Sequence, residues 1–388
     1  MTNLAAPARP AATAVQAKIK HLEAIAVSLP MTKPMKMAGV LIESADNVLV
    51  RVELAGGQVG WGEAASAHLM TGETVASMMA AIRYMAPALL AADAGDIGTI
   101  SARMDRLMYG NQSAKSAVEM ALHDSLGKTL GKPVYELLGG KLRSRVPVLW
   151  LLGTGSVDGD VAEAREKQAA GFVAFKVKVG IGDPLADAAR TRRVCAALGN
   201  GLLISADANQ GYSVDQALTY VKAMDSAAVD GAGLDFFEQP IAGHDVEGMA
   251  KIAAATRIPL GFDEGLHGID DLIRHHDMQA ARGCSLKTIK LGGLNGVVLA
   301  AKLCEKLDMK VNLACKVAES GIAAAAMMHL AAAVPAVEWG VSLSNQYLAD
   351  DVVRASVEVI DGHAEVPAGA GLGVEVDEAR VRKYARKV

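Results

Sequence analysis

Eight apolar runs follow one another through the last two thirds of the chain, and a segment with helical periodicity separates each run from the next. The runs are residues 146–152, 172–179, 202–206, 233–237, 258–262, 285–291, 310–314 and 336–341. Apolar stretches without alternating polar residues are typical of strands covered on both faces. Strands that alternate with helices in this way predict a parallel sheet closed into a barrel.

The rest of the chain predicts a second unit beside the barrel. Residues 20–55 contain short β-like runs and residues 77–138 show helical periodicity, which together indicate an α+β unit. The segment after residue 348 returns to short strands, and we expect it to fold back onto that unit. The predicted organisation is a tail without fixed structure over 1–19, an α+β capping domain over 20–145, the barrel over 146–347 and a returning segment over 348–388.

Composition and charge limit the classes of molecule that the protein is expected to bind. The chain has 388 residues, of which 51% are hydrophobic, enough for a barrel of roughly 250 residues and a smaller unit. The net charge of -4 leaves no basic surplus for nucleic acid or an anionic membrane surface. No apolar stretch is long enough to cross a membrane, and the first residues lack the apolar core of a secretory signal. The four cysteines are scattered along the sequence, as expected for free thiols in a reducing cytosol. We therefore expect a cytoplasmic enzyme with a small-molecule substrate and no nucleic-acid or membrane partner.

Three carboxylates stand at the ends of three successive apolar runs. They are Asp207, Glu238 and Asp263, about thirty residues apart, which is the length of one strand plus one helix. Each acid alone is readily explained as a helix cap, but three at matching strand ends are expected to converge at one mouth of the barrel. Converging carboxylates repel one another unless a cation neutralises them. Ligands with oxygen alone favour Mg²⁺, with Mn²⁺ as a substitute.

Lysines flank these acids in the sequence. Lys176 and Lys178 are two residues apart, so on a strand both point to the same face. A solvated surface strand is the simple alternative, but a buried parallel strand with two lysines requires anionic partners. Lys287 and Lys290 follow the third acid and have opposite parity, so at most one of them is expected to point inward, and parity does not choose between them.

Taken together, these motifs resemble the enolase superfamily, and within it the mandelate racemase/muconate lactonizing enzyme family. The similarity covers nearly the whole chain. It rests on Lys-x-Lys, Asp-x-Asn, Glu-Gln-Pro and Asp-Glu at four successive strands, followed by a lysine five residues before Gly-Gly. The resemblance implies an α/β fold, a (β/α)₇β TIM-like barrel under an α+β capping domain. It also implies a homo-oligomer, a dimer or an octamer.

The resemblance assigns roles to five of these residues. Asp207, Glu238 and Asp263 are the implied Mg²⁺ ligands. Lys178 and Lys287 are the implied bases, on opposite faces of the substrate. A lysine suits this task when burial and neighbouring cations lower its pKa toward the working pH.

The resemblance also implies residues that bind the substrate or support the metal ligands. Lys176 is expected to hold the substrate carboxylate, and Asn209, Glu319 and Lys36 are further candidates for substrate binding. Glu264 is expected to support the metal ligands, as is Asn209. Two cap loops, residues 30–39 and 64–72, are expected to set specificity.

The expected reaction is removal of the proton α to a carboxylate through an enediolate intermediate, by an isomerase that acts as a cycloisomerase, racemase or epimerase. Residues 310–322 contain no His, which disfavours the mandelate racemase branch, and Ser342 stands where muconate cycloisomerases usually carry Glu. The alternative on the same scaffold is a dehydratase of the cis-3-hydroxyproline type. Alternatives of another class are a Schiff-base lysine aldolase and a non-catalytic binding protein.

Overall fold

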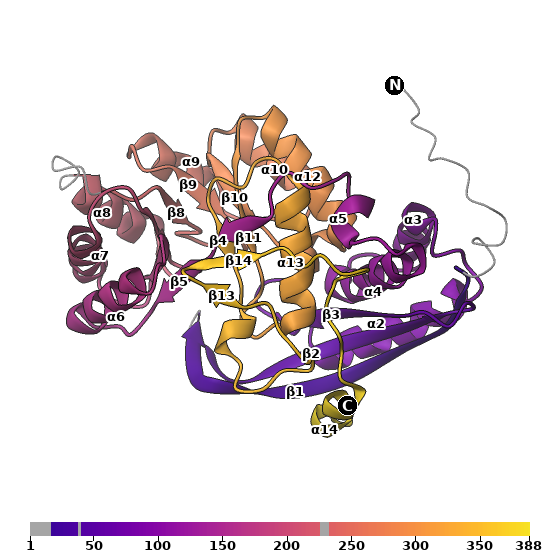
Figure 1. Cartoon of the computed structure of the whole chain (residues 1–388). Helices are drawn as coiled ribbons and strands as arrows, with labels where there is room; N and C mark the ends of the chain where they lie inside the picture. The colour runs from indigo at the N-terminus through magenta and orange to yellow at the C-terminus, as the bar shows by residue number, and fades with distance from the viewer. Residues whose placement is uncertain (1–16, 38–39, 226–232) are drawn as a thin grey trace.

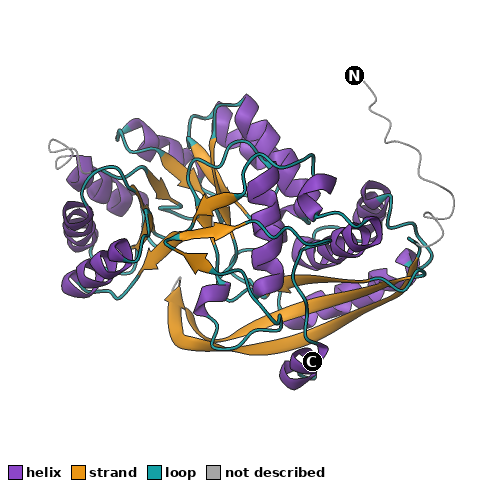
Figure 2. Cartoon of the chain, viewed as in Figure 1, coloured by secondary structure: helices purple, strands orange, loops and turns teal. Residues whose placement is uncertain are grey.

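A barrel of parallel strands surrounded by helices and an antiparallel sheet with its own helices make up the protein (Figure 1; Figure 2). The computed structural model describes residues 17–37, 40–225 and 233–388. Within those ranges, no helix combines the length and the apolar character needed to cross a membrane. Most of the predicted tail over 1–19 lies outside the described residues, and Ala17 and Ile19 at its end are buried in the folded chain.

The barrel contains eight strands that pair in chain order, each parallel to the next. A parallel bridge between Val148 and Val341 joins the first strand to the last. The prediction of a barrel beside an α+β cap is therefore confirmed. The strands are β5 (Leu149–Leu152), β6 (Ala174–Lys178), β7 (Leu203–Asp207), β8 (Phe236–Glu238), β9 (Leu260–Phe262), β10 (Gly283–Leu286), β11 (Lys310–Ala314) and β12 (Val341–Ser342).

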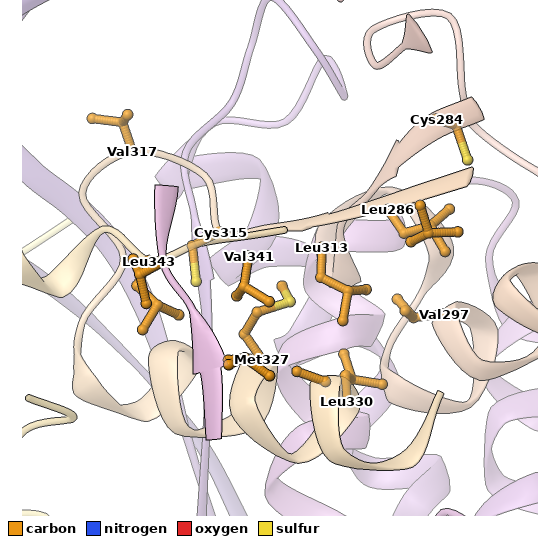
Figure 3. Packing of buried hydrophobic residues seen from close by; sticks show 14 of the residues in the cluster. Cys284, Leu286, Val297, Leu313, Cys315, Val317, Met327, Leu330, Val341 and Leu343 are labelled. Atoms are coloured by element: carbon orange, nitrogen blue, oxygen red, sulfur yellow. The ribbon is translucent and has the colours of Figure 1, made fainter. Parts of the chain in front are cut away.

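Helices follow the barrel strands and cover their outer faces. The Ala-rich helix α13 is buried along its whole length, and Figure 3 shows Met327 and Leu330 packed under Leu313 and Val341. Small side chains let this helix lie close to its neighbours, so its apolar character serves the protein core. The helices are α6 (Val157–Ala169), α7 (Pro184–Leu198), α8 (Val214–Asp225), α9 (Val246–Ala254), α10 (Ile269–Asp277), α11 (Thr288–Leu291), α12 (Leu294–Lys306) and α13 (Gly321–Ala333).

Two of the predicted apolar runs are divided between elements. The first run, 146–152, contains the end of β4 (Arg145–Pro147), which pairs outside the barrel, and then β5. The sixth run, 285–291, was expected to be one strand, but β10 ends at Leu286 and α11 follows. A strand cannot be told from a short helix by apolar character alone, and this division changes the position of Lys290.

The cap is an antiparallel sheet of β1 (Ile19–Met37), β2 (Val40–Leu54) and β3 (Val59–Ala65), with helices α2 (Val75–Leu89), α3 (Ile97–Leu107), α4 (Gln112–Leu130) and α5 (Val134–Leu137). Gly60 and Gly62 allow β3 and α4 to approach closely. A Cβ atom at Gly62 would lie 2.0 Å from the backbone oxygen of Ala117. The Gly-Trp-Gly segment is therefore a packing requirement of the cap.

Contacts from both ends of the chain connect the cap to the barrel. The buried carboxylate of Glu119, on α4, accepts hydrogen bonds from the backbone N–H groups of Leu294 (2.8 Å) and Asn295 (3.1 Å) at the start of α12. Near the C-terminus, β13 (Val359–Ile360) pairs with β14 (His363–Glu365), and β14 pairs with β4. The last helix, α14 (Glu378–Tyr384), lies beside β1, where the Arg386 backbone N–H donates to the Ala26 carbonyl oxygen (2.9 Å).

An aromatic pair closes the barrel interior near the N-terminal ends of its strands. The rings of Phe236 and Trp339 stack with their centroids 4.1 Å apart and their planes 8° apart. Gly261 and Gly283 leave room for the indole, because a Cβ at either position would lie 2.9 or 2.5 Å from it. The polar residues at the opposite, C-terminal ends of the strands thus lie above an apolar floor.

Candidate active site

The C-terminal ends of neighbouring strands place the predicted lysines and carboxylates in register. Lys178 on β6 is the register partner of Asp207 on β7, and Asp207 is the partner of Glu238 on β8. Register partners on adjacent parallel strands project to the same face. Lys176 and all three carboxylates, including Asp263, are only 1–3% exposed, so these charges face the closed interior of the barrel mouth.

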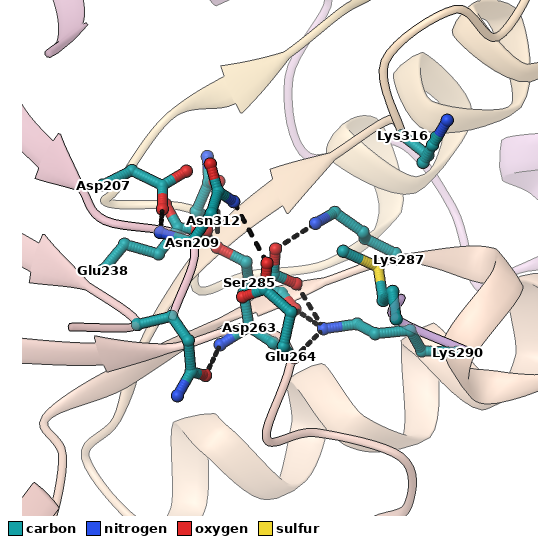
Figure 4. Close-up of polar contacts among 12 residues, drawn as sticks. Asp207, Asn209, Glu238, Asp263, Glu264, Ser285, Lys287, Lys290, Asn312 and Lys316 are labelled. Carbon is teal, nitrogen blue, oxygen red and sulfur yellow. Dashed lines mark hydrogen bonds and ion pairs between the residues drawn. The ribbon is translucent and has the colours of Figure 1, made fainter. Parts of the chain in front are cut away.

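Each of the three carboxylates is paired with at least one lysine, and Figure 4 shows the contacts of Asp263 with Lys287 and Lys290. Lys176 donates a hydrogen bond to Glu238, and Lys178 donates to Asp207 (2.5 Å). Lys287, directly after β10, donates to Asp263. The three acids expected to converge therefore do so together with all three predicted lysines.

Lys290 also contacts this network, although of the two lysines only Lys287 lines the cavity at the barrel mouth. Its ammonium group is 2.6 Å from the Asp263 carboxylate and donates to the Ser285 carbonyl oxygen (2.9 Å). Strand parity does not apply, because α11 begins at Thr288 and a helical turn brings the residue three positions later to the same side.

Two uncharged residues that the sequence analysis missed complete this network. The Ser285 hydroxyl lies 2.7 Å from the second oxygen of Glu238 and 3.1 Å from the Asn312 side-chain oxygen, and its one proton can be donated to either. That same Asn312 oxygen accepts from Lys176 (3.3 Å). Both residues occupy inward positions of buried strands, so the presence of a polar residue in an apolar run was the available signal.

The charged network lines a cavity at the mouth of the barrel. The cap contributes Ile42 and residues 66–70. Residues 66–70 belong to the second predicted specificity loop, 64–72. Cys315, Lys316 and Val317 line the cavity from the loop between β11 and α13, and Ser342 lines it from β12. Lys33, in the first predicted loop, lines a second cavity between β1, β5 and α6, which Lys178 and Leu151 also line. The two cavities thus adjoin at Lys178.

Burial and ion pairing shift the pKa values of several of these groups, among them Asp263, Lys287, Lys290 and Glu264. Burial raises the pKa of Asp263, but the charges of Lys287 and Lys290 outweigh burial and place it below the usual range. Burial lowers the pKa of Lys287, but the charges of Asp263, Glu264 and Glu238 outweigh burial and raise it. Burial, with the charges of Asp263 and Asp207, raises the pKa of Glu264 to about 8. At neutral pH, Asp263 is ionised, Lys287 is protonated and Glu264 is mostly protonated.

The other predicted site residues have different environments. The Asn209 side chain accepts a hydrogen bond from Lys178 (2.8 Å) and donates one to Glu264 (3.1 Å). Asn209 and Glu264 both line the cavity. Glu319 does not line either cavity; its carboxylate accepts from the Lys316 backbone N–H (2.9 Å) within its own loop. Lys36 is near the end of β1, and its side chain lies outside the described part of the structure.

The donor chemistry of the site fits a hard divalent cation. Asp207, Glu238 and Asp263 supply oxygen donors around one cavity, and one buried carboxyl oxygen of Glu264 has no hydrogen-bond partner in the described chain. Within the described residues, no three acidic, His or Cys side chains are already gathered at a spacing that would hold a metal. Lysines neutralise the carboxylates instead, so a cation would exchange places with ammonium groups.

Two family models match the chain in the order of its two units. The model of the mandelate racemase/muconate lactonizing enzyme N-terminal domain matches residues 21–139, and the model described as enolase C-terminal domain-like matches residues 159–380. The chain belongs to the mandelate racemase/muconate lactonizing enzyme family. This membership confirms the resemblance inferred from the lysine and carboxylate motifs and identifies the protein as an enolase-superfamily isomerase.

Several members of this family resemble the chain over nearly its full length. Muconate cycloisomerase 1 of Rhodococcus opacus is 32% identical over 95% of this chain and 98% of its own. The structure of the muconate lactonizing enzyme from Pseudomonas fluorescens, complexed with muconolactone, matches with a TM-score of 0.90 and 30% identity, over 96% and 100% of the two chains. The dipeptide epimerase from Cytophaga hutchinsonii, complexed with Mg and the dipeptide D-Ala-L-Val, matches with a TM-score of 0.88 and 27% identity, over 96% and 99%. Relatives with two different isomerisation reactions therefore share this scaffold.

Proposed function

We propose that this protein is a Mg²⁺-dependent isomerase that transfers the proton α to the carboxylate of a small acid. The product would be the epimer or enantiomer, or a cyclised isomer formed through the same enolate. The observation that carries this proposal is the position of Lys178 and Lys287. They end β6 and follow β10, four positions apart in a ring of eight strands, and both line one cavity. Strands four apart in such a ring face each other, so the two amines approach a substrate from opposite sides.

Asp207, Glu238 and Asp263 are the proposed Mg²⁺ ligands. A bound Mg²⁺ would supply positive charge to the oxygens of the substrate carboxylate, where negative charge accumulates once the α-proton is removed. The ammonium group of Lys176 lies over the Phe236 ring, 5.7 Å from its centroid, and faces the same interior. Lys176 is proposed to bind the substrate carboxylate from below, as a fixed positive charge that also stabilises the enolate.

Lys178 and Lys287 are proposed to transfer protons at opposite faces of the substrate. Lys287 carries a proton while it is paired with Asp263, because that carboxylate stabilises its ammonium form and raises its pKa. Once a cation took the place of this ammonium group, Lys287 would be free to give the proton to the opposite face of the enolate, in the direction in which Lys178 takes the α-proton. In the reverse direction the roles exchange. Positioned proton donors and acceptors of this kind contribute about 10²- to 10⁴-fold each to a rate.

Proton exchange with solvent tests the proposal. The Mg²⁺-loaded protein would be incubated in D₂O with amino acids, N-acyl amino acids, dipeptides, hydroxyprolines and muconate, and products followed by NMR and mass spectrometry. Deuterium at an α-carbon without loss of water is expected for at least one of them, and a keto or imino product would instead indicate a lyase.

Variants of the two lysines make the test specific. Lys178→Ala and Lys287→Ala should each slow isomerisation by at least about 100-fold, while Lys222→Ala on α8 serves as the control. For an epimerase, each site variant should still exchange one enantiomer but not the other. Isomerisation that continues at the normal rate in both site variants would rule out this pair as the bases.

A further inference from the structure

One lysine of the cavity has no acidic partner. Lys176, Lys178 and Lys287 each contact a carboxylate of the protein, whereas Lys316 forms no ion pair with any described residue. Figure 4 shows Lys316 apart from the paired cluster, with no contact drawn from its side chain. Its ammonium group therefore faces the cavity at a distance from the groups proposed to bind the reacting carboxylate.

Two acids, Glu319 and Asp46, raise the pKa of Lys316 by their charge without forming an ion pair with it, and one buried oxygen of Glu319 has no hydrogen-bond partner in the described chain. Glu319 accepts a hydrogen bond from the Lys316 backbone N–H (2.9 Å), and Asp46 contacts Arg386 (3.3 Å). Burial lowers the pKa of Lys316, and the charge of Lys287 acts in the same direction. A partly buried ammonium without a counter-charge is costly for the protein, so its presence in a cavity indicates a ligand that supplies the anion.

The loop that carries Lys316 is held from both sides. Ala318 has a left-handed backbone, with φ of 77°, and its carbonyl oxygen accepts from the buried Asn47 side chain of the cap (2.7 Å). The Glu319 backbone N–H donates to the Ser344 hydroxyl (3.1 Å). These contacts fix the backbone at Lys316 before any ligand arrives, which reduces the entropy lost on binding.

A second unpartnered polar group lines the same cavity beside this loop. The hydroxyl oxygen of Ser342, at the end of β12, is buried without a hydrogen-bond partner among the described residues. Ser342 is the register partner of Ala314, and its carbonyl oxygen accepts from the Cys315 backbone N–H (2.9 Å). Two free donors, one charged and one neutral, are thus carried by adjacent strand ends.

We propose that Lys316, assisted by the Ser342 hydroxyl, binds a second carboxylate of the substrate. The natural substrate is then a diacid or an amino-acid derivative with an additional acidic group. This inference rests on the proposed function, because it assumes that the first carboxylate of the substrate binds beside Lys176. An ammonium and a hydroxyl together match the acceptor oxygens of a carboxylate, and charge-assisted hydrogen bonds of this kind are strong.

The test compares diacids with their monoamides. Binding of succinate, glutarate and adipate, and of the monoamide of each, would be measured by calorimetry on the full-length, Mg²⁺-loaded protein. At one or more of these lengths, the diacid should bind about ten-fold more tightly than the monoamide. Lys316→Met should abolish this preference without weakening the monoamide, and Lys316→Arg should retain most of it.

The control is Lys302→Met, since Lys302 is an exposed lysine on α12 that lines neither cavity. The proposal is overturned if no diacid is preferred or bound by the unaltered protein, if the preference survives in Lys316→Met, or if Lys302→Met loses it to the same extent. Unchanged unfolding temperatures would show that the variants fold.

Failure of this inference is distinguishable from failure of the proposed function. A Lys316-dependent preference without any α-proton exchange would leave the second carboxylate site standing and remove the isomerase proposal. If α-proton exchange is equally fast for monocarboxylates and is not changed by Lys316→Met, the second carboxylate site is removed and the isomerase proposal stands.

Discussion

The carboxylate of Glu63, on β3 of the cap, accepts hydrogen bonds from both the backbone N–H (2.9 Å) and the hydroxyl (2.6 Å) of Ser320, at the start of barrel helix α13. It also accepts from the Ala323 backbone N–H (3.2 Å) and from the Asn47 side chain (2.7 Å). Glu63 is fully buried. A single cap residue thus accepts two of the backbone N–H groups that the start of a barrel helix leaves without a partner inside the helix.

Replacing Glu63 by Ala should lower the free energy of unfolding by at least about 3 kcal/mol, because several buried donors lose their acceptor. Chemical denaturation measures the change. Glu53→Ala, at a solvent-facing acid on β2, is the control and should have a much smaller effect. Equal losses in the two variants would show that the contact between Glu63 and Ser320 contributes little.

The pH dependence of stability should change in Glu319→Gln. Burial and the charge of Glu63 raise the pKa of Glu319 to about 8, from 4.5. Between these values the folded protein holds a proton that the unfolded chain has released, so this group lowers the free energy of unfolding as pH rises, by up to about 1.4 kcal/mol per pH unit.

Denaturation curves at pH 5, 6, 7 and 8 test this expectation. The unaltered protein should lose stability with rising pH more steeply than Glu319→Gln. Glu63, whose burial raises its pKa to about 7, acts in the same direction and should leave a residual slope in the variant. Parallel curves for the two proteins would mean that Glu319 is ionised throughout this range.

Mg²⁺ should raise the unfolding temperature of the unaltered protein, since a cation that binds only the folded state at 100 times its Kd stabilises that state by about 2.7 kcal/mol. Glu238→Gln should abolish the increase, because it removes a proposed ligand and leaves Lys176 without its acid. Glu163→Gln, at a carboxylate that accepts from Trp150 beside the second cavity, is the control and should keep the increase. A thermal unfolding series with Mg²⁺ measures both. If Glu238→Gln responds to Mg²⁺ like the control, the proposed ligand set is wrong.

The floor of the barrel should not tolerate Gly283→Ala. The added Cβ would lie 2.3 Å from the Lys310 carbonyl oxygen and 2.5 Å from the Trp339 ring. Either the backbone or the indole must therefore move, which should lower the free energy of unfolding by about 1–3 kcal/mol. Denaturation monitored by tryptophan fluorescence reports both the stability and the indole environment. Gly182→Ala, where a Cβ meets nothing within 4 Å, should change stability by less than about 0.5 kcal/mol. Similar behaviour of the two variants would mean that the floor repacks without cost.

The sequence by itself determined the barrel and the positions of its main charged residues. Period-two parity on a strand is a local property of the backbone, so the spacing of Lys176 and Lys178 was enough to place both on one face. The spacing of Asp207, Glu238 and Asp263 reflects the length of one strand and one helix. For that reason the sequence indicated that these acids end neighbouring strands.

The tertiary structure decided which polar groups meet. The sixth apolar run divides into a strand and a helical turn, and only this division brings Lys290 to Asp263. Glu319, a predicted substrate-binding residue, instead contacts its own loop, while Lys316 beside it lines the cavity without an ion-pair partner among the described residues. Such pairings depend on contacts between segments far apart in the chain, and hydrophobic periodicity carries no information about them. The sequence therefore specified the scaffold and its ring of charges, whereas three-dimensional packing alone determined which of those charges pair with one another in the part of the chain that the structure describes.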